Sequence, residues 1–297
     1  MKKTKYPFMT WLLAMLVGLL VLGGGMMLIS IRRVDMTQPA NMRWLVVGQD
    51  LLLFILPALW LAWRADNQPV AYLRLHKGMS VSTAVIAVFL MLLAMPAINL
   101  MGHWNEQLTL PSFLRPLEAW MQQMEQSAEW TTDRLLNATT VGTLLANVGL
   151  IGFLAAMSEE LTFRGVLLRF FTRQYTDKSR TPHTAIWAVA VVFSLIHFQF
   201  YGFIPRLLMG ALLGYALWWS GSLWVPVLMH FVNNATAVVV TFIFQKTGTD
   251  TSWLEAFGTG NTTWVGIVSL AVTAGMIYLL RRSTTMSNAS SRTSGGN

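Results

Sequence analysis

Long, uninterrupted apolar runs constrain this chain more than any other feature of its sequence. They lie at 8–31, 44–63, 79–101, 143–170, 183–200, 203–219, 222–243 and 263–280. About 20 apolar residues in an α-helix cross the ~30 Å hydrocarbon core of a bilayer. Because the runs are continuously apolar rather than alternating, they do not fit the strands of a transmembrane β-barrel. We therefore predict an all-α membrane protein, a bundle of about eight transmembrane helices.

The composition supports a bilayer environment and excludes several classes of protein. Hydrophobic residues make up 54% of the chain and charged residues only 11%, whereas soluble domains carry about a quarter charged residues. The net charge of +8 lies in short clusters between apolar runs, which is typical of topology signals and not of a nucleic-acid interface. The absence of cysteine excludes disulfides, cysteine-ligated metals and thiol nucleophiles.

The distribution of Lys and Arg predicts the orientation of the chain. The first apolar run is too long for the hydrophobic region of a signal peptide, so we expect a retained transmembrane helix. With the N-terminus inside, fourteen of the 21 Lys and Arg residues fall in inner segments. This excess predicts that both termini face the cytoplasm. The short polar tail and compact form suit a bacterial cytoplasmic (inner) membrane.

Ionisable residues inside apolar runs are costly, so each one suggests a function. Glu160 and Arg164 are four residues apart in the fourth run and share a helix face, where they can pair. Glu159 is rotated by about 100° and remains available for chemistry. Alternatively, these charges mark a helix end that reaches the membrane surface. Asp50, near one end of the second run, is expected to make a structural hydrogen bond or to lie near the outer interface.

His197 is predicted to lie at the same depth as Glu159. The polar loop 174–182 has its midpoint near Lys178, and Glu159 and His197 each lie 19 residues from that midpoint. In an antiparallel helical hairpin, equidistant residues reach the same level, so the carboxylate can face the imidazole. Phe193, four residues before His197, is expected beside its ring. A lone buried histidine would otherwise serve as a structural hydrogen-bonding group.

His230 and Asn234 lie four residues apart on one helix face, and both can donate hydrogen bonds. Such a pair also occurs as a polar contact between membrane helices. Taken with Glu159 and His197, it supplies what amide hydrolysis requires. Glu159 can take a proton from a water molecule that His197 orients, and His230 and Asn234 can stabilise the oxyanion. No serine nucleophile, metal or other cofactor is needed.

Three motifs in this region resemble those of the CPBP family of CAAX proteases and bacteriocin-processing membrane proteins. This family includes the type II CAAX prenyl endopeptidases and the proteins named for lysostaphin resistance. The motifs are Glu159-Glu160-x-x-x-Arg164, Phe193-x-x-x-His197 and His230-x-x-x-Asn234. The resemblance implies an intramembrane glutamic endopeptidase in which Glu159 and His197 activate water and His230 and Asn234 form the oxyanion hole. It assigns Glu160 and Arg164, beside Phe193, a supporting role.

The resemblance also predicts a division of the chain. Residues 1–142 hold three spans and an outer loop, 143–243 the catalytic core, 244–280 the last span and 281–297 a disordered tail rich in Ser, Thr, Gly and Asn. In the outer loop, 102–138, apolar residues recur at helical spacing after Pro111. This pattern predicts an amphipathic helix at the membrane interface, acting as a lid or a structural cover.

Two alternatives to a glutamic endopeptidase remain. Glu159, His197 and His230 could supply a His₂Glu zinc set, which would make the chain a membrane metalloprotease, although it has no HExxH motif. A non-catalytic membrane scaffold or bacteriocin-immunity protein could use the same fold. The expected partners are membrane lipid and a peptide or membrane-protein substrate, with no nucleic acid. The sequence identifies neither that substrate nor an oligomeric state.

Overall fold

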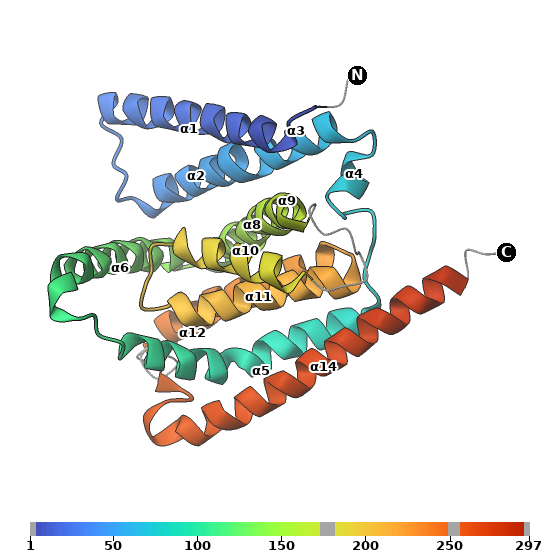
Figure 1. The fold of residues 1–297 in the computed structure, drawn as a ribbon. Helices are drawn as coiled ribbons and strands as arrows, with labels where there is room; N and C mark the ends of the chain where they lie inside the picture. The colour runs from blue at the N-terminus through green and yellow to red at the C-terminus, as the bar shows by residue number, and fades with distance from the viewer. Residues whose placement is uncertain (1–3, 173–181, 249–255, 294–297) are drawn as a thin grey trace.

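The computed structural model describes residues 4–172, 182–248 and 256–293, and these residues form helices and connecting turns without any strand (Figure 1). Six helices in this part of the chain are long and apolar enough to cross a membrane. They are Pro7–Ile31, Pro39–Ala65, Val81–Glu106, Val141–Thr172, Trp224–Thr247 and Gly260–Thr285. The all-α class is therefore confirmed, and the chain is an integral multi-pass membrane protein. The count of eight spans is wrong.

Two predicted spans form a shorter hairpin instead. α10 (His183–Leu195) has 13 residues, which at 1.5 Å per residue gives about 20 Å, less than the thickness of the hydrocarbon core. It is short because the chain leaves the helix at residues 196–202 and turns back. α11 (Phe203–Ser220) is not among the six spans and carries Arg206 in its first turn. The two helices pack against each other.

Several spans consist of consecutive helical segments. Besides α10 and α11, the helical elements are α1 (Pro7–Ile31), α2 (Pro39–Gln49), η1 (Asp50–Ile55), α3 (Leu56–Ala65), α4 (Pro69–Tyr72), α5 (Val81–Glu106), η2 (Ser112–Leu114), α6 (Arg115–Leu136), α7 (Val141–Asn147), η3 (Val148–Leu154), α8 (Ala155–Glu160), η4 (Leu161–Leu167), α9 (Leu168–Thr172), α12 (Trp224–Thr247), η5 (Gly260–Thr262) and α14 (Thr263–Thr293). The segments η1, η3 and η4 are π-helical. Such turns change the register of a helix and often occur at functional sites.

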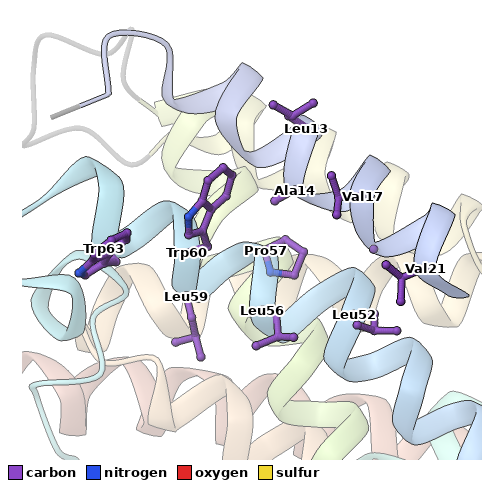
Figure 2. A pocket seen from close by; sticks show the side chains of 11 residues that line it. Leu13, Ala14, Val17, Val21, Leu52, Leu56, Pro57, Leu59, Trp60 and Trp63 are labelled. Atoms are coloured by element: carbon purple, nitrogen blue, oxygen red, sulfur yellow. The ribbon is translucent and has the colours of Figure 1, made fainter. Parts of the chain in front are cut away.

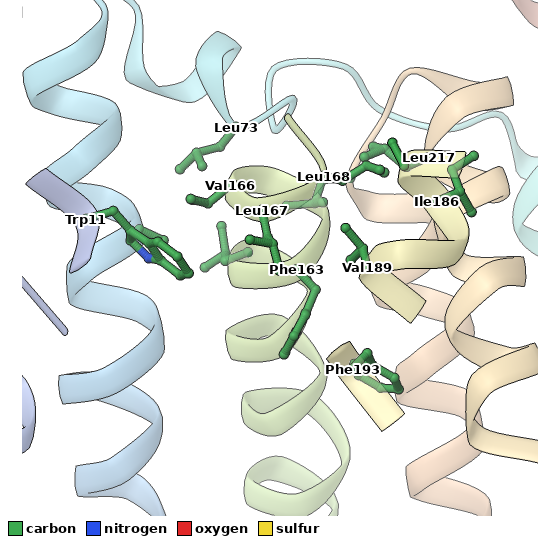
Figure 3. Packing of buried hydrophobic residues seen from close by; sticks show 14 of the residues in the cluster. Trp11, Leu73, Phe163, Val166, Leu167, Leu168, Ile186, Val189, Phe193 and Leu217 are labelled. Carbon is green, nitrogen blue, oxygen red and sulfur yellow. The ribbon is translucent and has the colours of Figure 1, made fainter. Parts of the chain in front are cut away.

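The fourth span, α7 to α9, is the centre of the bundle. All seven residues of its η4 segment are buried, and an apolar cluster surrounds them (Figure 3). Within this cluster the Phe163 and Phe193 rings meet edge to face, with centroids 5.2 Å apart. Because lipid tails are as apolar as these side chains, close packing rather than escape from water holds the helices together. The tight packing fixes the position of the polar residues that the span also carries.

The start of α1 and the end of α14 lie on the same side of the bundle (Figure 1). This agrees with both termini facing one compartment, and the assignment of that compartment to the cytoplasm stays a prediction. α14 extends to Thr293, so residues 281–293, expected as a disordered tail, continue the last helix. The predicted loop 174–182 lies outside the described residues except for Pro182.

The amphipathic helix predicted in the outer loop is present as α6. It lies at the end of the bundle opposite to the start of α1 (Figure 1). None of its residues is buried, in agreement with a helix at an interface rather than inside the bundle. Its C-terminal end is tied to the second span, because Arg134 donates to the Thr37 carbonyl over 3.1 Å and Arg43 donates to the Leu135 carbonyl over 3.3 Å.

Candidate active site

The fourth span carries a fully buried ion pair. Arg164 Nη1 lies 2.7 Å from Glu160 Oε1, and both side chains are completely inaccessible. Arg164 also donates to the Gly210 carbonyl of α11 over 2.9 Å and lies over the Phe193 ring, 4.6 Å from its centroid. A buried charge is tolerated only with such compensation. The i, i+4 pairing predicted from the sequence is confirmed.

Glu160 also binds the first polar residue of the third motif. His230 Nδ1 lies 2.9 Å from Glu160 Oε1, so one carboxylate oxygen serves both the guanidinium and the imidazole. A carboxylate accepts hydrogen bonds, and Nδ1 is therefore the protonated nitrogen that donates. His230 is 3% exposed, and this bond fixes the ring with Nε2 directed to Glu159, the first residue of the first motif. The sequence did not predict the bond between Glu160 and His230.

Glu159 faces two imidazole rings. Its Oε2 lies 3.8 Å from His197 Nε2 and 3.9 Å from His230 Nε2. This oxygen is buried and has no hydrogen-bond partner among the described residues. The expectation that Glu159 and His197 lie at one level is therefore confirmed, although residues 173–181 between their helices are not described.

Phe193 and the backbone of α10 orient His197. The His197 Nδ1 atom lies 2.7 Å from the Phe193 carbonyl oxygen, so Nδ1–H donates and Nε2 points to Glu159. The Phe193 ring is fully buried and meets both imidazoles edge to face, at 5.0 Å from His197 and 5.9 Å from His230. It thus packs against both rings. The position predicted for Phe193 beside His197 is confirmed.

Asn234 lies one turn beyond His230 on α12. Its Nδ2 donates to the Ile151 carbonyl of η3 over 3.1 Å, and its Oδ1 accepts from Asn233 over 3.2 Å. No direct contact joins Asn234 to Glu159 among the interactions of the described residues. A primary amide carries two N–H donors, so one of them remains beyond the Ile151 bond.

The second span reaches the site through Asp50. Ser158, which precedes Glu159, donates to Asp50 Oδ1 over 3.0 Å, and Asp50 is only 5% exposed. The structural hydrogen bond expected for Asp50 is therefore present, and its position relative to the outer interface stays a prediction. The partner could not be read from the sequence, because the two residues lie 108 positions apart.

Residues around the turn that follows His197 were not predicted from the sequence. Glu125 of α6 accepts the Tyr201 backbone N–H at Oε2 over 3.2 Å, and Arg206 of α11 binds Gln199. Partial burial raises the pKa of Glu125 above its usual range, while the Tyr201 N–H and the Arg206 charge oppose the shift. The sequence does mark Arg206 as unusual, because its charge interrupts the apolar run 203–219. Nothing in the sequence marks Glu125, because acidic residues are common on amphipathic helices.

A separate cavity of about 620 Å³ lies between α1 and the second span. Figure 2 shows that apolar side chains of these two segments line it. Without a titratable side chain it has no means of reaction chemistry, and its lining suits lipid. As for metal ions, no group of three His, Cys, Asp or Glu side chains in the described ranges is placed to hold one.

Comparison with known proteins places the motif-bearing segment in a known group. Residues 141–236 match the model of the Rce1-like family of type II CAAX prenyl endopeptidases, which confirms over this segment the resemblance predicted from the motifs. The chain is also 31% identical over 86 residues to the uncharacterized protein YpbD of Bacillus subtilis (strain 168), an alignment that covers 28% of the chain. It spans about two fifths of the length of that relative, 39%. No solved structure matches the chain.

Proposed function

We propose that this chain is an intramembrane glutamic endopeptidase that hydrolyses a peptide bond of a membrane-associated protein or peptide. The observation that carries the proposal is the position of Glu159 Oε2, which is buried, has no hydrogen-bond partner among the described residues and is almost equidistant from His197 Nε2 and His230 Nε2. The match of residues 141–236 to a CAAX prenyl endopeptidase family supports the same reaction class. The residues that would carry the reaction lie in the predicted core, 143–243.

The separation of 3.8 Å between Glu159 Oε2 and His197 Nε2 suits a bridging water molecule. Polar atoms more than about 3.5 Å apart are often joined through water, and hydrogen bonds of about 2.8 Å from one oxygen span this gap. Such a water would lie against both a carboxylate and an imidazole. We infer that these two groups hold the nucleophile and take its proton.

The hydrogen-bond network defines how these groups can share the proton. Because His197 Nδ1–H donates to the Phe193 carbonyl, Nε2 of the neutral ring is a free acceptor. Glu159 in its ionised form is the second acceptor. Attack of water on the carbonyl carbon would then transfer one proton to this pair, and the pair would return it to the leaving amine.

The developing oxyanion needs donors, and His230 and Asn234 are the candidates. His230 already uses Nδ1–H in its bond to Glu160, so Nε2 can donate only when the ring is an imidazolium. Asn234 retains one N–H beyond its bond to Ile151. Two such donors held in place are the arrangement that stabilises a tetrahedral intermediate.

The position of the site among apolar helices restricts its substrate. A peptide bond must enter a bundle whose outer surface faces lipid, so a membrane protein segment or a lipid-associated peptide has access and a freely soluble protein does not. Membrane lipid is therefore a partner of the enzyme as well as its solvent.

The test is cleavage of a peptide library presented in detergent micelles or vesicles, with wild type beside Glu159→Gln and each with and without a metal chelator. We expect cleavage that persists in chelator and disappears in the variant. Loss of cleavage in chelator would instead indicate a metalloprotease built on Glu159, His197 and His230. Equal cleavage by wild type and Glu159→Gln would contradict the proposal. An exposed carboxylate, Glu129→Gln, controls for the substitution.

A further inference from the structure

The turn after His197 contains a residue in an unfavourable backbone conformation. Phe198 has a φ of 54°, in the left-handed region that bulky residues avoid for steric reasons. Such a residue persists only where the surrounding structure holds it, and these residues gather at functional sites. Because Phe198 directly follows His197, whatever holds this turn also sets the position of the imidazole.

The amphipathic helix α6 holds one side of the turn. The Trp120 ring meets the Phe198 ring edge to face with centroids 6.2 Å apart, and it lies 5.4 Å from the Phe200 ring. One turn later on the same helix, Glu125 Oε2 accepts the Tyr201 N–H over 3.2 Å. Two side chains of α6 therefore contact three of the four residues from 198 to 201.

The opposite side of the turn is held by α11 and α5. Arg206 donates from Nη1 to the Gln199 carbonyl and from Nη2 to Gln199 Oε1, each over 2.9 Å. Asn105 Nδ2 donates to the Phe200 carbonyl over 2.9 Å, and Asn105 Oδ1 accepts the N–H of Ile204 over 2.8 Å. Every residue from 198 to 201 thus has an external partner.

Charge joins the two sides of the turn. The Arg206 guanidinium interacts electrostatically with the Glu125 carboxylate of α6 and with Glu159. It also interacts electrostatically with His197. The attraction between Arg206 and Glu125 acts across the turn, alongside the hydrogen bonds that each of them makes to it.

We infer that Trp120 and Glu125 of α6 are positioning residues, which act through the turn 198–201 to hold His197 against Glu159. This inference rests on the proposed function. The separate attachment of α6 to the second span through Arg134 and Arg43 makes the role testable. Because that attachment survives changes at Trp120 and Glu125, these changes loosen the turn without releasing the helix.

The test combines amide hydrogen exchange with kinetics. The variants are Trp120→Ala, Trp120→Phe and Glu125→Ala, and the matched controls on the same helix are Trp130→Ala and Glu129→Ala. Trp130 is 46% exposed against 40% for Trp120. Because its ring centroid lies 4.5 Å from Arg134, Trp130→Ala tests the attachment of α6 to the second span separately from the turn. Exchange is followed by mass spectrometry in peptides that cover residues 198–202.

Both measurements have defined expectations. Trp120→Ala and Glu125→Ala should raise amide exchange in the turn by about tenfold or more, while both controls leave it unchanged. In the same two variants kcat should fall by about 10- to 100-fold, since a misplacement of about 1 Å costs up to 10²-fold in rate, with KM changed less than about twofold. Trp120→Phe keeps an aromatic face toward Phe198 and Phe200 and should restore most of kcat.

Two results would overturn the inference. Unchanged exchange in Trp120→Ala and Glu125→Ala would show that α6 does not hold the turn, whatever the activity. Raised exchange with an unchanged kcat would show that the turn does not position His197 for the reaction. Failure of the proposed function is a different result, namely equal cleavage by wild type and Glu159→Gln. The exchange measurement is independent of that outcome.

Discussion

Glu160→Gln should destabilise the fold far more than the same change at its neighbour. Glu160 Oε1 lies 2.7 Å from Arg164 Nη1 and 2.9 Å from His230 Nδ1, and the side chains of Glu160 and Arg164 are completely buried. Removal of the carboxylate charge leaves a buried guanidinium without its anion. Breaking a buried pair in this way costs about 3–5 kcal/mol. Glu159 makes no direct hydrogen bond through its buried Oε2, so Glu159→Gln should cost less than about 1 kcal/mol.

The free energy of unfolding can be measured for both variants by titration of the micelle with a denaturing detergent. Intrinsic fluorescence is a suitable signal, because the chain has 13 tryptophans. A double variant, Glu160→Leu with Arg164→Met, provides a further check, since an apolar replacement of a whole buried pair is often close to neutral. It should therefore recover most of the loss. Equal stability of Glu160→Gln and Glu159→Gln would refute the assignment of Glu160 as the structural carboxylate.

Two further substitutions test packing between the spans. A Cβ atom at Gly18 would collide with the Leu52 carbonyl of the second span, whereas nothing lies within 4 Å of a Cβ at Gly24. Gly18→Ala should therefore lower the free energy of unfolding by about 1–3 kcal/mol, and Gly24→Ala should leave it unchanged. Equal stabilities of the two variants would contradict the close approach of α1 to the second span. Ser158→Ala removes the donor to the buried Asp50 and should cost about 1–3 kcal/mol, measured by the same titration. The double variant Ser158→Ala with Asp50→Leu should regain most of that loss, and no gain would show that the bond does not join the two spans.

The features predicted correctly were those with local periodicity. Glu160 and Arg164 pair because four residues make about one helical turn, and Glu159 and His197 meet because they are equidistant from a single loop. Both rules depend only on helix geometry and therefore work without tertiary information. The amphipathic helix α6 followed from the same periodicity in a polar segment.

The span count failed because hydropathy does not locate the end of a helix. Residues 183–200 are apolar, yet α10 stops at Leu195 and the chain turns at His197 and Phe198. That turn depends on contacts from α6, α11 and α5, which lie far away in the sequence. The bonds of Asp50 to Ser158 and of His230 to Glu160 were missed for the same reason, since no spacing rule relates residues on different spans. Long-range partners of a site are determined by packing.

The most direct test of the central claim is the rate of cleavage by Glu159→Gln relative to wild type, on one substrate of the wild-type enzyme and in the same lipid. The variant keeps the shape of the side chain and loses its ability to accept a proton. Since a general base contributes about 10²–10⁴-fold, kcat should fall by at least about 10²-fold while the free energy of unfolding stays within about 1 kcal/mol of wild type. A folded variant that cleaves at the wild-type rate would contradict the account.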